Sequence, residues 1–458
     1  MLRLWFEDAL LAEGWASRVR LGIEDGRVVT VERDVARAPG DEAHGVALPG
    51  LCNVHSHAFQ RGMAGLAERR GPAHDDFWTW REVMYRFLDR LTPEDVEAIT
   101  AQAFAEMLEA GFTRVGEFHY LHNDVDGRAY ANPGELTDRI VAARDATGIG
   151  LTLLPVFYAH GGFGGAEPKP GQRRFLNDPE SFARLVEHGR SAVRGSPDAV
   201  VGIAPHSLRA ITPQELAAIL PLARGGPVHI HAAEQVGEVA DCVAWSGARP
   251  VRWLLDHAPV DGAWCLIHAT HLDTDETTAF ARTGAVAGLC PITEANLGDG
   301  TFPAQGYLAQ GGRFALGTDS NILIDAAGEL RALEYSQRLA ARSRNLLAPR
   351  EGASVGASLF AGALAGGAQA LGVKALGAAP GGLRVGAMAD IVALDAEHPS
   401  LAERRGDDLL DAWIFAAGRE AVSSVWGAGE QVVADGRHRH AGPIAARYRA
   451  TLRRLLAA

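Results

Sequence analysis

The sequence predicts an α/β fold: a (β/α)8 barrel of the TIM type beside a small β-sandwich domain built from both termini. Eight short apolar runs alternate with segments of helical spacing, which is the pattern of a barrel of parallel strands. Asp-Gly turns separate β-type runs near both ends of the chain, and polar residues collect where the predicted barrel strands end. A doubly wound sheet is the alternative, although no glycine fingerprint follows an early strand.

Three segments follow from this prediction. Residues 1–47 are expected to form the first part of the small β domain, and residues 48–376 the barrel. Residues 377–458 are expected to return to the small domain and to end in a helix. The Asp-Gly dipeptides at 25–26 and 435–436 lie between apolar runs, so each predicts a hairpin turn.

Apolar runs mark the barrel strands. They are 51–55, 114–119, 151–158, 200–206, 228–233, 265–271, 286–292 and 314–319. Two intervening helices have a clear start, because Thr92 and Thr212 each precede a proline, as an N-cap precedes a first-turn proline. The uncharged segment 352–373 is long enough to span a bilayer, but its Ala and Gly content favours a buried amphipathic helix.

Two insertions in this pattern are long and polar. They lie at 71–90 and 160–178 and are rich in glycine, proline and aromatic residues. We expect both to be loops over the mouth of the barrel, where barrels of this type hold their active sites.

Charge and cysteine content argue against several classes of protein. The formal net charge is -12 and no Lys/Arg-rich run occurs, so no nucleic-acid partner is expected. The apolar start is broken at once by Arg3, and neither a signal peptide nor a membrane partner is expected. The four cysteines lack CxxC spacing, which favours free thiols in a reducing cytoplasm.

A pair of histidines follows the first predicted barrel strand. His55 and His57 are two residues apart, so in a strand both imidazoles face the same side. Such a pair supplies half of a zinc or iron site. Taken alone, the pair is more often two polar residues at a strand end, so the other strand ends decide between the two interpretations.

Polar residues capable of chemistry end five of the other predicted strands. They are Glu117, His119 and Tyr120; His206 and Arg209; His229, His231 and Glu234; His268 and His271; and Thr318, Asp319, Ser320 and Asn321. A barrel core would prefer Val, Ile and Leu at such positions, so their convergence on one face indicates a chemical site.

With these residues the chain resembles the amidohydrolase superfamily of metal-dependent hydrolases over essentially its whole length. The resemblance rests on Pro49-Gly50 before His55 and His57, on His231, His268 and Asp319, and on the segment 386–392. It implies that His55, His57, His231 and Asp319 hold a divalent metal.

The resemblance also implies one metal per chain, as in the deaminase branch of the superfamily. Dinuclear members carry a bridging carboxylated lysine at the end of strand three or four, and neither Lys169 nor Lys374 lies there. Three histidines and an aspartate suit zinc and iron alike, and we expect zinc, with iron as the alternative. The resemblance gives Glu234 the role of proton shuttle.

Two further catalytic roles follow from the same resemblance. His268 is expected to polarise or orient the reacting centre. Asp319 is expected to accept a proton from the attacking water in addition to binding the metal.

Within this branch the chain is most similar to the N-formimino-L-glutamate deiminase family of histidine degradation. The similarity is carried by the segments 57–61, 77–82, 117–120 and 205–209. It implies hydrolysis of N-formimino-L-glutamate to N-formyl-L-glutamate and ammonia. It also implies that the substrate is held by Gln60, Arg81, Tyr120, His206 and Arg209. A dicarboxylate substrate needs fixed cations, and an arginine fork matches a carboxylate.

Other interpretations of these residues stay open at this stage. Surface salt bridges explain Arg81 and Arg209 equally well. An amidohydrolase-type deaminase or chlorohydrolase acting on a nucleobase or another heteroaromatic compound would need a flat aromatic pocket, and Phe77, Trp78 and Trp80 suit one. A non-enzymatic barrel is not expected, because all four ligand positions are filled.

Three more histidines lie near the expected metal in the sequence. His119, His229 and His271 are expected to be supporting or core residues rather than ligands. We also expect a small-molecule dicarboxylate as the binding partner, a homodimer, and a cytoplasmic location.

Overall fold

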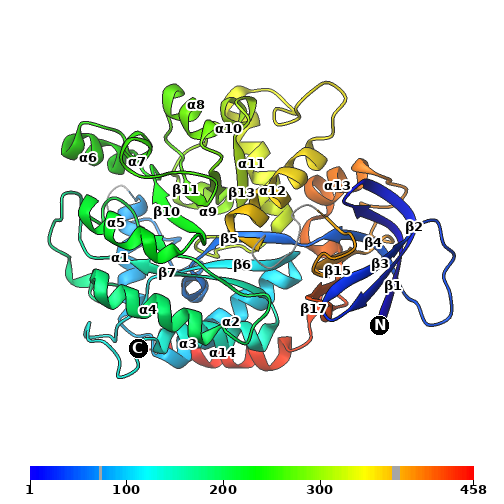
Figure 1. Cartoon of the computed structure of the whole chain (residues 1–458), viewed down its shortest axis with the longest axis horizontal. Coiled ribbons are helices and arrows are strands. Elements are labelled where there is room, and N and C mark those ends of the chain that lie inside the picture. The colour runs from blue at the N-terminus through cyan, green and yellow to red at the C-terminus, as the bar shows by residue number, and fades with distance from the viewer. Residues whose placement is uncertain (72–74, 374–381, 458) are drawn as a thin grey trace.

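The computed structural model describes residues 1–71, 75–373 and 382–457. Parallel strands form a barrel in the middle part of the chain (Figure 1). They are β5 (Leu51–Ser56), β6 (Phe112–His119), β7 (Gly150–Phe157), β8 (Val200–Val201), β9 (Ala204–Pro205), β10 (Val228–Ala232), β11 (Trp264–His268), β12 (Val286–Leu289) and β13 (Arg313–Leu316). The order is β10-β11-β12-β13-β5-β6-β7-β8, and β9 also pairs with β7. Every predicted run contains a strand, so the predicted barrel is confirmed.

The fourth strand position is broken into β8 and β9. A Cβ on Gly202, at the break, would lie 2.4 Å from the carbonyl oxygen of Pro227, so only glycine allows this close approach. Single bridges from Ile203 to Val228 and from Ser207 to His231 close the ring here. The closure places the chain after β9 beside β10, where the site lies.

Helices surround the barrel. They are α1 (Phe77–Leu88), α2 (Pro93–Glu109), α3 (Glu135–Thr147), α4 (Pro179–Ala192), α5 (Pro213–Ile219), α6 (Val236–Ser246), α7 (Pro250–His257), α8 (Thr274–Arg282), α9 (Pro291–Leu297), α10 (Ala304–Ala309), α11 (Ala326–Ala341) and α12 (Val355–Ala370). The two predicted caps are confirmed: the hydroxyls of Thr92 and Thr212 accept the backbone N–H groups of Asp95 and Glu215.

The prediction of a loop at 71–90 was wrong, because this segment contains α1. Asp76 caps the helix by accepting the N–H groups of Trp78 and Thr79, and Phe77, Met84 and other apolar residues at helical spacing bury one face. The glycine and proline near residue 71 dominated the prediction, whereas the apolar spacing after residue 76 decides the structure. The insertion at 160–178 is mostly irregular, with one short 3-10 turn at Pro170–Gln172.

Strands from both ends of the chain form a second sheet, at the right of Figure 1. They are β1 (Leu2–Leu11), β2 (Gly14–Glu24), β3 (Arg27–Glu32), β4 (Glu42–Pro49), β14 (Ile391–Leu394), β15 (Val422–Gly427), β16 (Glu430–Ala434) and β17 (Arg437–His438). The order β17-β16-β15-β14-β4-β1-β2-β3 joins the two termini through β14 and β4. A buried apolar cluster of its own, with Phe6 from β1 and Trp426 from β15, fills this domain.

Both predicted hairpin turns are confirmed. Asp25 and Gly26 join β2 to β3 with φ values of 48° and 74°, and Asp435 and Gly436 join β16 to β17 with 50° and 69°. Positive φ at both central residues is the geometry that Asp-Gly favours in two-residue hairpins. The predicted domain boundary at 376–377 lies outside the described residues.

The chain ends in the predicted helix, α14 (Ala441–Leu456), after a short α13 (Asp407–Ala412). Arg447 and Arg454 on α14 pair with Glu97 and Asp95 on α2, so the last helix returns to the side of the barrel (Figure 1). These pairs connect the C-terminal helix to α2 on the outside of the barrel.

The uncharged segment at 352–373 contains the buried helix α12, as predicted. A Cβ on Gly366 would lie 1.9 Å from the carbonyl oxygen of Phe314, so glycine lets this helix lie directly against β13. Among the described residues no helix is both long and apolar enough to cross a membrane.

Candidate metal centre and active site

Four buried side chains converge at the carboxyl ends of the barrel strands. His55 and His57 come from the end of β5, His231 from β10, and Asp319 from the turn after β13. Their ligand atoms lie within 4.8 Å of one another. Asp319 Oδ1 is 3.2 Å from Nε2 of His55 and 3.3 Å from Nε2 of His57, and the Nε2 atoms of His55 and His231 are 3.0 Å apart.

The hydrogen bonds behind these histidines show that the residues fit a metal ion. Nδ1 of His57 lies 3.0 Å from the carbonyl oxygen of Phe118, and Nδ1 of His231 lies 3.0 Å from that of His206. A carbonyl only accepts, so both Nδ1 atoms carry the proton and both Nε2 atoms present lone pairs. The Nε2 lone pair of His57 faces the carboxylate of Asp319 and that of His231 faces Nε2 of His55, an arrangement that suits a metal cation between them.

Burial keeps the imidazoles of His55 and His57 neutral. It lowers the pKa of His55 to about 3 and the pKa of His57 below its usual value, although Asp319 opposes the shift at both. A neutral imidazole is the form that binds a metal.

Left-handed backbone geometry recurs at the strand ends that form this centre. His268 and Asp319 have φ values of 67° and 43°, and Ala233, next to Glu234, has 52°. Such values are costly for residues with a Cβ and persist where the surrounding structure enforces them.

Glu234 and His268 form a second polar group beside the ligands. Their closest atoms, Oε1 of Glu234 and Nε2 of His268, are 3.7 Å apart. Burial raises the pKa of Glu234, and His268 and Arg209 oppose that shift. Burial tends to lower the pKa of His268, but Glu234 and Glu294 outweigh it and raise the pKa. The arrangement is able to hold and transfer a proton.

Glu294 is a site residue that the sequence argument missed. Its Oε1 lies 3.2 Å from Nδ1 of His268 and accepts the backbone N–H of Cys290 at 2.9 Å. The buried carboxylate therefore fixes the orientation of the His268 ring. Its position just beyond the predicted seventh strand was the available signal, but the run 286–292 itself contains no histidine or carboxylate.

One pocket collects the predicted residues, with all but His55 lining it. They are His57, Gln60, Arg81, Tyr120, His206, Arg209, His231, Glu234, His268 and Asp319. The pocket is also lined by Phe77, Trp80, Met84, Tyr85, Tyr158, Phe175 and Leu297. Most of the latter come from the two insertions, which were predicted to lie over the barrel mouth; Phe77 and Trp80 were named as candidates for an aromatic pocket, whereas Met84, Tyr85 and Phe175 were not. Tyr158 carries a clearer signal, because it ends a predicted strand.

The two arginines of this pocket do not form surface salt bridges. Arg209 is 9% exposed, and among the described residues the one carboxylate within 4.0 Å of its guanidinium nitrogens is that of Glu234, at 3.8 Å. Nε of Arg81, and Nε and Nη1 of Arg209, are buried without a hydrogen-bond partner in the described structure. Both guanidinium groups lie over the ring of Trp78, at 4.5 and 5.8 Å from its centroid. Cations held this way are available to an anionic ligand.

Gln60, Tyr120 and His206 connect the metal centre to the pocket. Nε2 of Gln60 donates to the hydroxyl of Tyr120 at 2.8 Å, and the Tyr120 ring packs against His57 with centroids 4.7 Å apart. His206 holds His231 through its carbonyl oxygen, while its ring lines the pocket. The pocket therefore contains polar side chains in addition to the metal ligands and the two arginines.

His119, His229 and His271 do not line the pocket, as expected of supporting or core residues. His229 bonds through Nε2 to the carbonyl oxygen of Ala370 on α12, and His119 packs against His122. Lys169 lies in the 160–178 insertion, and Lys374 lies outside the described residues. All four cysteines are buried and free, as predicted.

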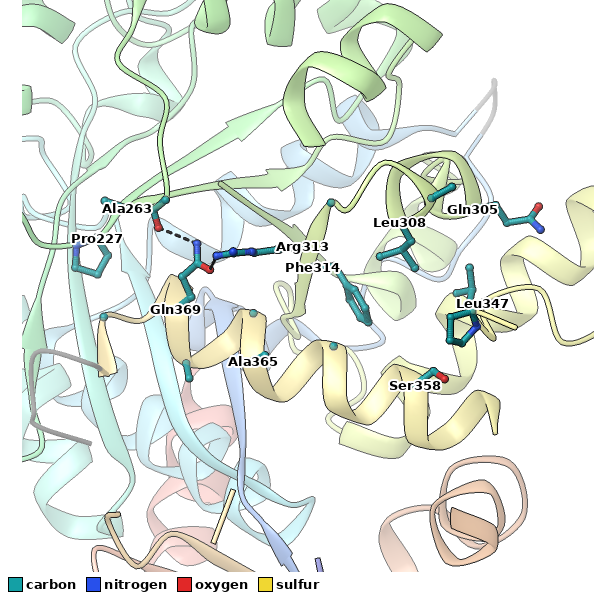
Figure 2. A pocket seen from close by; sticks show the side chains of 18 of the residues that line it. Pro227, Ala263, Gln305, Leu308, Arg313, Phe314, Leu347, Ser358, Ala365 and Gln369 are labelled. Atoms are coloured by element: carbon teal, nitrogen blue, oxygen red, sulfur yellow. Dashed lines mark hydrogen bonds between the residues drawn. The ribbon is translucent and has the colours of Figure 1, made fainter. Parts of the chain in front are cut away.

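A larger pocket lies at the opposite end of the barrel, between the starts of β10 and β13 and helix α12 (Figure 2). Its charged lining residue, Arg313, donates to the side chain of Gln369 on α12. The other lining residues in the described part of the chain are apolar or neutral, so they offer this pocket no acid, base or metal ligand.

Comparisons with known proteins agree with this geometry. Residues 46–432 match the amidohydrolase family, and residues 4–45 match the N-terminal domain of formimidoylglutamate deiminase HutF. The chain is 51% identical over 440 residues to a formimidoylglutamate deiminase of Pseudomonas aeruginosa, covering 96% of each protein. It is 28% identical over 360 residues to an 8-oxoguanine deaminase of the same species, covering 74% of this chain and 76% of that one.

Two solved structures have the same fold. An amidohydrolase from Brucella melitensis is 54% identical and superposes with a TM-score of 0.95, with 100% of both chains covered. An adenosine deaminase from Xanthomonas campestris with bound zinc is 23% identical, with a TM-score of 0.81 over 100% of this chain and 99% of that one. The latter likeness concerns the fold alone.

Proposed function

The chain belongs to the amidohydrolase family, and from that premise we propose that it hydrolyses N-formimino-L-glutamate to N-formyl-L-glutamate and ammonia in histidine degradation. The observation that most directly supports this substrate is the pair of arginines, Arg81 and Arg209. Arg209 is buried and Arg81 half-buried, and both have buried nitrogens without a partner among the described residues, so beside a His3Asp cluster they suit a small dicarboxylate.

We expect one divalent metal per chain, zinc with iron as the alternative, held by His55, His57, His231 and Asp319. When bound, the metal would supply Lewis acidity and lower the pKa of water toward neutrality. Metal analysis of the fully loaded protein should give one equivalent per chain. Two equivalents that both resist dialysis would contradict this prediction.

The residues around the cluster account for the proton transfers. Water adds to the formimino carbon, the bond from that carbon to its terminal nitrogen breaks, and ammonia leaves. Asp319 accepts a proton from the water, and Glu234 carries a proton to the leaving nitrogen. His268, held by Glu294, hydrogen-bonds the reacting group and keeps it oriented.

The substrate's carboxylates are held on the other side of the pocket. Arg81 and Arg209 provide the charge, and Gln60, Tyr120 and His206 provide hydrogen-bonding groups beside them. Holding both carboxylates in place sets the formimino carbon beside Glu234 and His268. Such positioning lowers an activation barrier by several kcal/mol.

The alternative function is deamination or dechlorination of a nucleobase or another heteroaromatic compound. Aromatic residues in the pocket favour it, among them Phe77 and Trp80. However, the guanidinium groups lie over Phe77 and Trp78, with Arg209 5.8 Å from both centroids. The faces of these rings are therefore occupied by guanidinium groups, and an uncharged nucleobase needs no such cations for binding.

Incubation with a panel of formimino amino acids and heteroaromatic amines tests the proposal. Ammonia and N-formyl-L-glutamate should form from N-formimino-L-glutamate in equal amounts. Formamide with free glutamate, or rapid deamination of guanine or cytosine without activity on the formimino acid, would refute it. The homodimer and the cytoplasmic location stay predictions.

A further inference from the structure

We propose that Tyr158 is an additional substrate-binding residue, whose hydroxyl donates a hydrogen bond to the side-chain carboxylate of the substrate, and that Gln172 positions this hydroxyl. The inference rests on the proposed function, and it assigns a role to the insertion at 160–178. Tyr158 follows β7, is 5% exposed, and lines the same pocket as Arg81 and Arg209.

The direction of the Tyr158 hydroxyl proton follows from its neighbour. The side-chain oxygen of Gln172 accepts the backbone N–H of Lys169 at 2.7 Å, which fixes the orientation of the amide. Its NH2 group must then face Tyr158, and it donates to the hydroxyl oxygen at 2.7 Å. The hydroxyl is an acceptor in this bond, so its own proton is available for another acceptor.

No acceptor for that proton is recorded among the described residues, and the pocket is the polar space that Tyr158 borders. Burial raises the pKa of Tyr158, which keeps the hydroxyl protonated at neutral pH, although Arg209 and Arg81 oppose the shift. A neutral donor beside two guanidinium groups completes a site for a carboxylate with oxygen atoms to share.

The insertion holds Tyr158 at three points. The side-chain oxygen of Asn177 accepts its backbone N–H at 3.1 Å, and its carbonyl oxygen accepts the backbone N–H of Asn177 at 2.9 Å. Gln172, 1% exposed, holds the hydroxyl from the far side, and the Phe175 ring packs against the phenol at 5.5 Å. A residue fixed at main chain, ring and hydroxyl binds with little loss of conformational entropy.

Ring contacts indicate which carboxylate Tyr158 binds. Both tyrosines pack against His206 and Phe175, but Tyr120 also packs against the ligand His57, whereas no ring contact between Tyr158 and a ligand histidine is recorded among the described residues. Tyr158 thus lies one residue farther from the metal centre than Tyr120. The α-carboxylate is attached to the carbon that bears the formimino nitrogen, and the side-chain carboxylate lies farther along the substrate. Tyr158 therefore matches the side-chain carboxylate.

The test is Tyr158→Phe with three substrates. For N-formimino-L-glutamate, loss of a donor to a charged acceptor should reduce kcat/KM by about 10- to 150-fold, mostly through KM. The reduction should be similar for N-formimino-4-aminobutyrate, which lacks the α-carboxylate. It should nearly vanish for the analogue in which a methyl group replaces the side-chain carboxylate.

Two further variants sharpen the result. Gln172→Met should raise KM for the same two substrates by less, because the hydroxyl survives but loses its orientation. Tyr130→Phe is the control: Tyr130 bonds Asp124 and Arg174 outside the pocket, so its kinetics should match the wild type.

Each outcome has one meaning. An unchanged KM in Tyr158→Phe, or an equal loss on all three substrates, overturns the role of Tyr158 while leaving the proposed function intact. A wild-type protein without activity on any formimino acid overturns the proposed function instead.

Discussion

Glu234→Gln is expected to lower kcat on N-formimino-L-glutamate by at least ~100-fold, the scale of a lost acid–base group. The amide keeps the size and one acceptor of the carboxylate but cannot carry the proton to the leaving nitrogen. KM should change little, because the arginines remain. Turnover at saturating substrate measures the effect, with exposed Glu430→Gln as the control for the substitution.

Asp319→Asn should cause a loss of similar size for a different reason. Oδ1 of Asp319 lies 3.2 Å from Nε2 of His55 and 3.3 Å from Nε2 of His57, as expected of shared metal ligands, so this variant tests proton acceptance and metal binding together. Metal content separates the two. Either variant that turns over like the wild type with normal metal content would show that its assigned role is wrong.

The barrel was predictable because its strands leave a simple pattern. Apolar runs ending in polar residues identify both the strands and the edge at which those residues meet, and His231 and Asp319 needed no further information to be placed there. The hairpin turns were equally clear, since Asp-Gly accepts positive φ at both positions.

Contacts between distant segments were not predictable in the same way. The glycine and proline before helix α1 led to the prediction of a loop, although the sequence also contains the capping residue Asp76 and the helical apolar spacing after it. Glu294 supports His268 only because two neighbouring strands are paired in the barrel. The partnership of Gln172 with Tyr158 depends on how an irregular insertion returns to the end of β7, which no local periodicity encodes.

Whether the arginines pair with carboxylates of the chain is another property that only the structure reveals. The sequence leaves Arg81 and Arg209 equally suited to surface salt bridges and to substrate. The folded chain buries Arg209 and leaves donors on both residues unpartnered among the described residues. Such donors are costly to bury without a partner, so their presence beside the cluster favours an anionic substrate.

Arg209→Met should reduce kcat/KM for N-formimino-L-glutamate by about 30- to 4000-fold. Removing one partner of a buried charge pair typically costs ~2–5 kcal/mol, and ~1.4 kcal/mol corresponds to a factor of ten. Methionine keeps much of the apolar stem, and the metal content should be unchanged because Arg209 is not a ligand. Steady-state kinetics and metal analysis measure the two quantities, and exposed Arg449→Met on α14 serves as the control.

The same variant distinguishes the two proposed functions through the substrate. A formimino amino acid without a side-chain carboxylate should be poor with the wild type and should lose less on Arg209→Met, because one charge pair is already missing. A heteroaromatic deaminase would show the opposite: loss of the cation would leave its preferred substrate nearly unaffected. An equal loss on dicarboxylate and monocarboxylate substrates would mean that Arg209 supports the fold of the pocket and does not bind a carboxylate.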